Sequence, residues 1–571
     1  MTISRPIRTF PPAGARGRAL WVSRPLALAV LVFGMLGRVV AAQVVTRGPY
    51  LQLQRPTSVV VRWRTDVATD SRVRHGSSPA ALSLFASDPA STMEHSVVVS
   101  GLAAETRYFY SVGTSTATLA GGDSTHFFAT APPPGANRPL RIWATGDSGT
   151  ANANALAVRD SYLAYAGGRA TDVWLMLGDN AYFSGTDAEY QAAVFDAFPG
   201  VLRNTFLWPA LGNHDGISAN SASQTGPFFD IFTLPAAAEA GGVPSGTEAY
   251  YSFDVADVHF VCLDSYGISR SATGAMAAWL ASDLGANTRS WTIAYWHHPP
   301  YSKGSHDSDV ETELVEMRQS LVPVLEAGGV DLVLSGHSHA YERSFLLDGR
   351  YGISTSLTPA MKKNPGSGRE EGSGAYVKRA GRYPHNGTVY VVAGTSGQVG
   401  GGSFDHPAMY LSAAELGSLV VDVDGDRLDA RFLTSTGTLA DHFTLVRSTS
   451  FHTIASCRLL DTRLPPGSGG GPALAPGAER LVTVAGRCGI PAFARTIAAN
   501  VTVTASTAAG WIVLAAGAAA PSATSTLNFR AGQTRANNAR ASLGPGGSVG
   551  VRSGMTAGAV DVVIDVSGYF D

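Results

Sequence analysis

Five short polar motifs, each placed at the end of an apolar run, constrain the fold of this chain more than any other feature. They are Gly146-Asp147-Ser148-Gly149, Gly178-Asp179-Asn180-Ala181-Tyr182, Gly212-Asn213-His214-Asp215, Ala294-Tyr295-Trp296-His297 and Gly336-His337-Ser338-His339. Apolar runs such as 140–144, 173–177 and 330–334 predict strands that are buried on both faces. Loops that leave the ends of such strands carry the chemistry of α/β proteins. The pattern therefore predicts an α/β domain with all five motifs gathered at one edge of one sheet.

The pattern of apolar, turn and helix-forming residues changes twice after residue 42, which predicts three domains. A chain of 571 residues exceeds the size of a single hydrophobic core. Residues 44–133 and 448–571 contain short strand-like segments separated by turn residues, which predicts a β-sandwich at each end of the mature chain. Residues 138–447 alternate apolar runs with helical stretches such as 309–327, which predicts α/β layers. Three consecutive prolines, 132–134, mark the linker between the first two domains.

The first 42 residues predict an export signal. Five arginines precede the apolar run 26–36, and Ala41-Ala42 offers small residues for cleavage. A single membrane anchor is the alternative, but Arg38 interrupts the apolar run and a bilayer span needs about 20 apolar residues. We therefore expect a secreted, extracytoplasmic protein with no membrane span after cleavage.

Charge and cysteine content narrow the possible partners and the compartment. Only 15% of the residues are charged and the net charge is −2, so no basic surface for nucleic acid is expected and the partner should be a small molecule. An oxidising compartment would permit Cys457 and Cys488 to pair. Cys262 lies in the apolar run 258–263, which predicts a buried thiol. The sequence carries no indication of the oligomeric state.

Each polar residue of the motifs has an ordinary structural explanation when it is taken alone. An aspartate can cap a helix, an asparagine often lies in a turn, and a histidine before a proline is usually structural. The pair His337 and His339 after a buried strand is more typical of metal ligation. All five motifs together, in this order, favour a metal site.

The residue types of the site indicate which metals it would bind. Imidazole suits iron and zinc, whereas carboxylate and phenolate favour a harder ion such as ferric iron. Asp179 is the natural bridging ligand between two ions. Two ions about 3.5–4 Å apart can bind a phosphate, lower the pKa of a bound water and stabilise the charge on the attacking and leaving oxygens.

With Tyr182 three residues after Asp179, the ordered motifs resemble those of the purple acid phosphatases, within the calcineurin-like metallophosphoesterases. The resemblance covers residues 44 to about 446. Tyr182 makes it specific, because most other metallophosphoesterases lack a tyrosine ligand there. It implies a fibronectin-III-like domain in residues 44–133 and a four-layer αββα metallophosphoesterase domain in residues 138–447. Residues 448–571 weakly resemble accessory β-sandwich modules of bacterial secreted proteins.

The resemblance also implies roles for individual residues. Ferric iron would be held by Asp147, Asp179, Tyr182 and His339, and a second ion, Fe, Zn or Mn, by Asp179, Asn213, His297 and His337. His214 would contact the substrate phosphate. His306 falls where plant-type enzymes have a histidine that aids departure of the leaving group, although the segment 301–305 diverges from theirs. His298, next to a ligand, is expected to be structural.

The expected function is that of a secreted acid phosphatase that hydrolyses phosphate monoesters by attack of a metal-bound hydroxide. One alternative is a phosphodiesterase or nucleotide-hydrolysing member of the same superfamily, because loops such as 218–242 would set the choice of substrate. Another is a non-catalytic secreted binding protein, against which the complete set of ligands argues.

Overall fold

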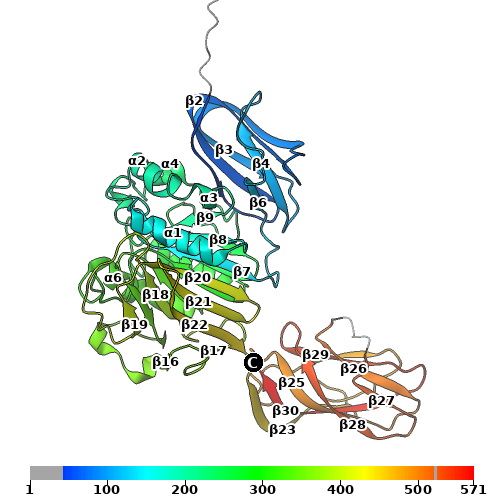
Figure 1. The fold of residues 1–571 in the computed structure, drawn as a ribbon. Coiled ribbons are helices and arrows are strands. Elements are labelled where there is room, and N and C mark those ends of the chain that lie inside the picture. Colours follow the sequence, from blue (N-terminus) through cyan, green and yellow to red (C-terminus); the bar gives the residue numbers. More distant parts are fainter. Residues whose placement is uncertain (1–42, 520–523) are drawn as a thin grey trace, which may run out of the picture. The chain divides into compact units, whose positions relative to one another are not determined.

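The computed structural model describes residues 43–519 and 524–571 (Figure 1). The predicted export signal, residues 1–42, lies outside the described residues. Within the two described ranges, no helix combines the length and the apolar character that a bilayer crossing requires. Buried hydrophobic side chains from residues 50–445 form one cluster, and those from residues 459–566 form a second.

A β domain forms the N-terminal part of the described chain. Its strands are β1 (Val45–Gln52), β2 (Ser58–Gly76), β3 (Leu84–Ser100), β4 (Arg107–Gly113), β5 (Thr118–Gly121) and β6 (Phe127–Ala129). The long strand β2 pairs with β1 through residues 60–65 and with β4 through residues 72–76, and β3 pairs with it along both parts. Val59, Val61 and Trp63 share one buried face of β2, because successive side chains of a strand point to opposite faces, and Val60 and Arg62 on the other face are buried as well.

Two seven-stranded sheets form the central part. The first central sheet has the order β17 (Tyr376–Arg379), β22 (Leu439–Ser448), β21 (Arg427–Thr434), β20 (Gly417–Asp424), β7 (Leu140–Thr145), β8 (Val173–Met176) and β9 (Leu207–Pro209). The second central sheet has the order β10 (Tyr251–Val255), β11 (Val258–Cys262), β12 (Trp291–Tyr295), β13 (Leu332–Ser335), β18 (Val389–Ala393), β14 (Tyr341–Ser344) and β19 (Met409–Ala413). A small hairpin joins β15 (Leu346–Leu347) to β16 (Lys362–Asn364).

The expectation of a single sheet was therefore wrong. Strands β7, β8 and β9 are parallel neighbours in the first central sheet, whereas β12 and β13 are parallel neighbours in the second. All five strands are buried on both faces and consist mostly of apolar residues. Such runs identify a buried strand but carry no information about which strand it pairs with, so the runs alone did not show that the motifs are divided between two sheets.

Helices connect these strands. They are α1 (Ala153–Ala166), α2 (Asp187–Tyr190), α3 (Pro199–Leu202), α4 (Pro227–Ile231), α5 (Ala275–Ala286), α6 (Thr312–Glu316) and α7 (Val322–Ala327). Helix α1 lies across β20 and β21 of the first central sheet (Figure 1). Its start is fixed by Asn152, whose side chain accepts a hydrogen bond from the backbone N–H of Ala155 at 3.0 Å. The helical stretch predicted at 309–327 forms as α6, a π-helical turn at Met317–Leu321 and α7.

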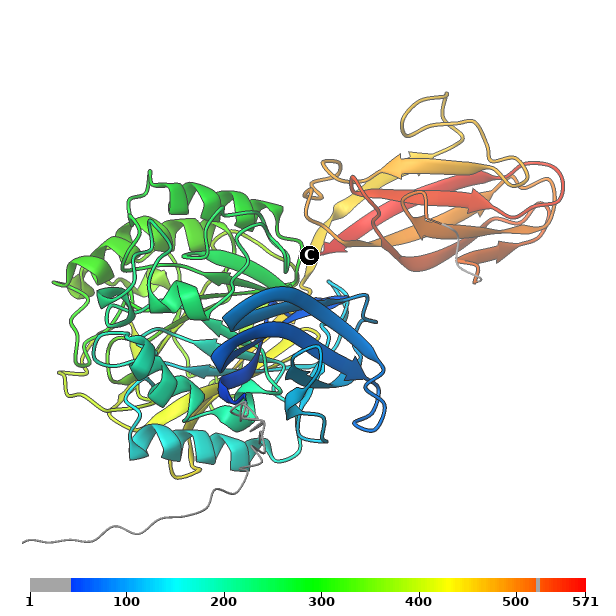
Figure 2. The same cartoon turned by 90° about the horizontal axis from the view of Figure 1, so that it is seen from above.

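Two four-stranded sheets form the C-terminal part (Figure 2). One has the order β23 (Phe451–Asp461), β30 (Asp561–Phe570), β25 (Thr496–Thr504) and β28 (Arg535–Ser542). The other has the order β24 (Glu479–Thr483), β29 (Ser548–Ser553), β26 (Gly510–Ala516) and β27 (Leu527–Phe529). Cys457 and Cys488 form a disulfide, while Cys262 is a buried free thiol in β11, as predicted.

Candidate metal centre

The polar side chains of the five motifs meet where strands of the two central sheets end. Asp147 follows β7, Asp179 and Tyr182 follow β8, and Asn213 follows β9, all in the first central sheet. The second central sheet contributes His297 after β12 and both His337 and His339 after β13. The structure therefore brings together all seven residues that were predicted as metal ligands, from two sheets.

One set of possible metal-ligand atoms surrounds the phenol oxygen of Tyr182. Its Oη lies 3.0 Å from Asp147 Oδ1, 3.0 Å from Asp179 Oδ2 and 3.2 Å from His339 Nε2. Both carboxylates are buried. We call these four residues the tyrosine group.

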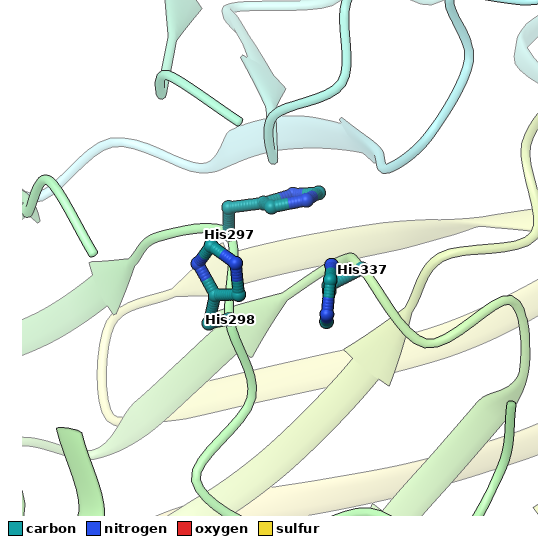
Figure 3. Close-up of side chains that lie close together, drawn as sticks. All are labelled: His297, His298 and His337. Carbon is teal, nitrogen blue, oxygen red and sulfur yellow. The ribbon is translucent and has the colours of Figure 1, made fainter. Parts of the chain in front are cut away.

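A second set surrounds the amide oxygen of Asn213. Asn213 Oδ1 lies 3.0 Å from His297 Nε2 and 3.0 Å from His337 Nδ1. His297 Nε2 is also 3.3 Å from Asp179 Oδ2, so Asp179 reaches both sets. Figure 3 shows the rings of His297 and His337 beside that of His298. We call Asp179, Asn213, His297 and His337 the asparagine group.

Hydrogen bonds on the far side of two imidazoles fix which ring nitrogen faces the centre. His297 Nδ1 lies 2.9 Å from the carbonyl oxygen of Leu177, so this nitrogen carries the proton and donates it. His337 Nε2 lies 3.3 Å from Glu311 Oε2 and donates in the same way. When the second nitrogen of each ring is unprotonated, His297 Nε2 and His337 Nδ1 turn lone pairs toward an amide oxygen that also offers only lone pairs. Such an assembly of acceptors fits a cation between them.

Electrostatics favour the same conclusion. Burial alone would lower the pKa of His297, but the carboxylates of Asp179 and Asp147 raise it to about 9. Burial and the same two carboxylates raise the pKa of Tyr182 far above its usual range. Among residues 43–519 and 524–571, no lysine or arginine forms an ion pair with Asp147 or Asp179. The negative potential of two buried carboxylates is therefore left to be balanced by imidazoles or by a metal.

The backbone of the centre adopts conformations that L-residues rarely occupy. Asp147, Asp179 and His337 have φ values of 56°, 53° and 64°. Each such residue costs of order 1 kcal/mol, and strain of this kind concentrates at functional sites. Gly212 is required for a different reason, since a Cβ there would lie 2.2 Å from Asp179 Oδ1.

Asp215 ties the second and third motifs together, a role that the sequence did not reveal. Its buried carboxylate accepts hydrogen bonds from the backbone N–H groups of Asn180 at 3.1 Å and Gly212 at 2.9 Å. It also accepts from Asn180 Nδ2 at 2.9 Å and from the Tyr190 hydroxyl at 2.6 Å. Asp215 therefore holds the loops of Asp179 and Asn213 in a fixed relative position. Its place in the third motif was the only sequence signal of this role.

Replacing Asp215 with alanine is expected to lower the free energy of unfolding by about 3 kcal/mol, because four buried donors lose their acceptor. Metal affinity should fall as well, since the two loops lose their common anchor. Chemical denaturation with metal titration measures both. Asp160→Ala is the control, because that carboxylate is 63% exposed and pairs only with Arg159. A stability of Asp215→Ala equal to that of the control would contradict the anchoring role.

Three further histidines lie beside the centre. His214 Nδ1 is 2.7 Å from the carbonyl oxygen of Phe183 and donates to it, which leaves Nε2 facing the centre, 3.9 Å from Asp179 Oδ2. The ring of His306 lies against that of His337, with centroids 3.8 Å apart and the ring planes tilted by 35°. The buried ring of His298 has its centroid 4.3 Å from that of His337. His298 contacts Ser265 Oγ through Nδ1 at 2.8 Å and through its backbone N–H at 3.0 Å.

Glu311 connects His306 to the asparagine group and was missed by the sequence interpretation. Its Oε2 lies 2.9 Å from His306 Nδ1 and 3.3 Å from His337 Nε2. Burial raises the pKa of Glu311, but hydrogen bonds from His337 and His306 outweigh this and lower it to about 2. Glu311 lies in no motif, so no sequence signal could have identified it.

Comparison with known proteins identifies two families that match parts of this chain. Residues 140–341 match the family model described as calcineurin-like phosphoesterase, and residues 46–130 match the model of the purple acid phosphatase N-terminal domain. Purple acid phosphatase 23 of Arabidopsis thaliana is 31% identical over 279 residues, which cover 44% of this chain and 57% of that protein. Purple acid phosphatase 18 of the same plant is 29% identical over 303 residues, which cover 50% of this chain and 63% of that protein. The chain thus spans less than two thirds of the length of either relative.

A solved structure supports the fold. The purple acid phosphatase PPD1 from yellow lupin (Lupinus luteus) seeds superposes with a TM-score of 0.54 at 17% identity, over 70% of this chain and 75% of that one. The purple acid phosphatase N-terminal model matches the N-terminal β domain, and the calcineurin-like phosphoesterase model matches the α/β region with the candidate metal centre. Residues 46–130 and 140–341 thus belong to two domain families, the purple acid phosphatase N-terminal domain and the calcineurin-like phosphoesterases, and the two relatives with similar sequences compared above are purple acid phosphatases.

Proposed function

We propose that the chain is an acid phosphatase with two metal ions that hydrolyses phosphate monoesters. The observation that carries this proposal is the position of Asp179. Its Oδ2 lies 3.0 Å from Tyr182 Oη in the tyrosine group and 3.3 Å from His297 Nε2 in the asparagine group. One carboxylate can thereby serve two adjacent cations, which is the arrangement that phosphoester hydrolysis by two metals requires.

The donor chemistry of the two groups suggests which ions they would hold. The tyrosine group offers a phenol and two carboxylates, which suits ferric iron, and the asparagine group offers an amide and two imidazoles, which suits Fe, Zn or Mn. When bound, the ions would supply Lewis acidity toward the phosphate oxygens and an activated water. The ligands proposed are Asp147, Asp179, Tyr182 and His339 for the first ion and Asp179, Asn213, His297 and His337 for the second.

His214 and His306 are proposed to act on the substrate. Because His214 Nδ1 donates to the carbonyl of Phe183, its Nε2 is free to meet a phosphate oxygen beside Asp179. Because Glu311 accepts a hydrogen bond from His306 Nδ1, that ring is held in one orientation with Nε2 available to carry a proton. His306 would deliver this proton to the departing alkoxide.

The remaining domains are proposed to support this centre. We propose a fibronectin-III-like N-terminal domain, a four-layer αββα arrangement around the two central sheets and an accessory β-sandwich at the C-terminus. Removal of residues 1–42 as an export signal would release the protein outside the cytoplasmic membrane. Small phosphorylated molecules are the proposed substrates, and no nucleic acid partner is expected.

A direct experiment compares hydrolysis of a phosphomonoester and a phosphodiester by the metal-loaded full chain. We expect the monoester to be hydrolysed faster, with activity lost after chelation and restored by adding iron with zinc or manganese. A faster reaction with the diester would identify a phosphodiesterase instead. Two bound metals without hydrolysis of either ester would contradict an enzymatic function.

A chain that ends after Thr449 is expected to keep full phosphatase activity. Every proposed ligand precedes β22, and this strand ends at Ser448, one residue beyond the boundary at residue 447 that the sequence predicts. The buried hydrophobic side chains of residues 459–566 form a separate cluster. Activity per bound metal pair is the measurement. If the shortened chain folds and binds two metals but is inactive, residues 450–571 must contribute to the centre and the proposed boundary is wrong.

A further inference from the structure

Two arginines beneath the segment that carries His306 are fully buried without a carboxylate partner. Arg318 and Arg350 are both 0% exposed. Among residues 43–519 and 524–571, neither guanidinium has a carboxylate oxygen within the 4.0 Å of an ion pair. A buried charge is normally paired, as Arg343 is with Asp441 elsewhere in this domain. The charge of Arg318 and Arg350 therefore calls for a different counter-ion.

The two guanidinium groups also retain N–H groups that no described residue accepts. Arg318 uses Nη1 and Nε to donate to the carbonyls of Pro300, Ser308 and Tyr351, and Arg350 uses Nη1 to donate to the carbonyl of Gly352 at 3.1 Å. Arg318 Nη2 and both Nε and Nη2 of Arg350 have no acceptor within the described ranges. Leaving one such buried donor unmet costs about 1–3 kcal/mol.

His406 adds a fourth unmet donor at the same place. Its Nδ1 accepts the backbone N–H of Ala408 at 3.2 Å, so the proton of the neutral ring is on Nε2, which has no partner among the described residues. The ring is buried and lies 5.8 Å from the ring of Tyr301. Arg350 lies over the same Tyr301 ring at 4.9 Å. Arg318 also lies near Tyr301 and Arg350, because it donates hydrogen bonds to the carbonyls of Pro300 and Tyr351, which are their neighbours in the sequence.

Nearby carboxylates are already occupied. Asp309 accepts from the backbone N–H of Ser354 at 2.7 Å and from its hydroxyl at 2.5 Å, and Lys303 Nζ lies 3.1 Å from it. Glu326 accepts from the hydroxyls of Tyr351 at 2.7 Å and Tyr390 at 2.8 Å. The cluster of Arg318, Arg350 and His406 therefore presents donors and positive charge but no free acceptor.

We propose that Arg318, Arg350 and His406 enclose a small monovalent inorganic anion, chloride under ordinary conditions. A water molecule could accept some of these hydrogen bonds, but it would leave two buried positive charges uncompensated. The lining side chains are nearly or fully buried, so the occupant would be shielded from solvent. The anion would hold Arg318 in place, and Arg318 in turn holds the carbonyls of Pro300 and Ser308 on either side of the segment with His306. This inference does not depend on the proposed phosphatase activity.

Bromide provides the test, because it replaces chloride and scatters anomalously. Crystals of the full chain grown in sodium bromide should show an anomalous peak bordered by Arg318 Nη2, Arg350 Nε and His406 Nε2. Anomalous peaks confined to the protein surface, with ordinary water density at this place, would overturn the proposal.

Thermal unfolding of the full chain gives an independent measurement. Replacing gluconate with chloride at equal ionic strength should raise the Tm by about 3 °C or more, since a ligand that binds only the folded state stabilises it. Arg350→Met removes two of the donors and one charge, and it should abolish this difference. Arg427→Met is the control, because Arg427 is 40% exposed and pairs with Glu370, and it should retain the difference. Equal Tm values for the wild-type protein in the two salts would contradict the proposal even if Arg350→Met does not fold.

Discussion

Alanine at Asn213 or at His337 is expected to lower the rate of phosphomonoester hydrolysis at least about 100-fold, because each change removes a proposed ligand of the second ion. Asn213 Oδ1 lies 3.0 Å from both imidazoles of the asparagine group, so its loss removes the atom on which that group converges. The tyrosine group retains its own ligands. We therefore expect one tightly bound metal per chain in each variant, against two in the wild-type protein, as measured by elemental analysis.

His442→Ala is the matched control for these variants. His442 lies on β22 with its side chain 40% exposed and pairs with Glu371 at 2.8 Å. This variant should keep two metals and full activity. Near-normal turnover with full metal occupancy in either Asn213→Ala or His337→Ala would refute the asparagine group as a metal site.

Tyr182→Phe is expected to abolish the visible absorption band of the oxidised, iron-loaded protein. A phenolate bound to ferric iron transfers charge to the metal when it absorbs visible light, and phenylalanine keeps the packing of the ring but removes the oxygen. Asp147 remains near both Asp179 and His339 in this variant, so some metal and some activity should survive. The absorption spectrum and the iron affinity of the variant are the measurements.

Tyr266→Phe controls for the general effect of removing a tyrosine hydroxyl near the centre. The ring of Tyr266 lies 6.3 Å from that of His298, and the residue is 38% exposed. The band should be unchanged in this variant. A band of full intensity in Tyr182→Phe would show that Tyr182 is not a ligand and that its hydroxyl serves only the hydrogen bonds to Asp147 and Asp179.

Much of the catalytic domain was predictable because buried strands and their end loops have a local signature. The apolar runs at 140–144 and 173–177 became β7 and β8, and the motif residues after them lie together. Residue type, spacing and order located the five motifs, and the resemblance to the purple acid phosphatases selected the seven side chains within them that meet. The purple acid phosphatase family was also evident from Tyr182 and the order of the motifs, and the family models match the same regions.

What the sequence did not reveal depends on pairing and on contacts between distant residues. The motifs were expected on one sheet, but β12 and β13 belong to the second central sheet, because an apolar run does not specify its neighbour. Glu311 and Asp215 act through hydrogen bonds to His337 and Asn180, which only the folded backbone brings within reach. The unpaired burial of Arg318 and Arg350 likewise had no local signature, since arginine is normally an exposed residue.

Metal content together with the visible spectrum of the purified full chain tests the central claim most directly. The account predicts two metal ions per chain, one of them iron, and a violet or pink colour in the oxidised protein that arises from Tyr182. An oxidised protein that holds iron but shows no visible band, or one that binds fewer than two metals under saturating conditions, would contradict it.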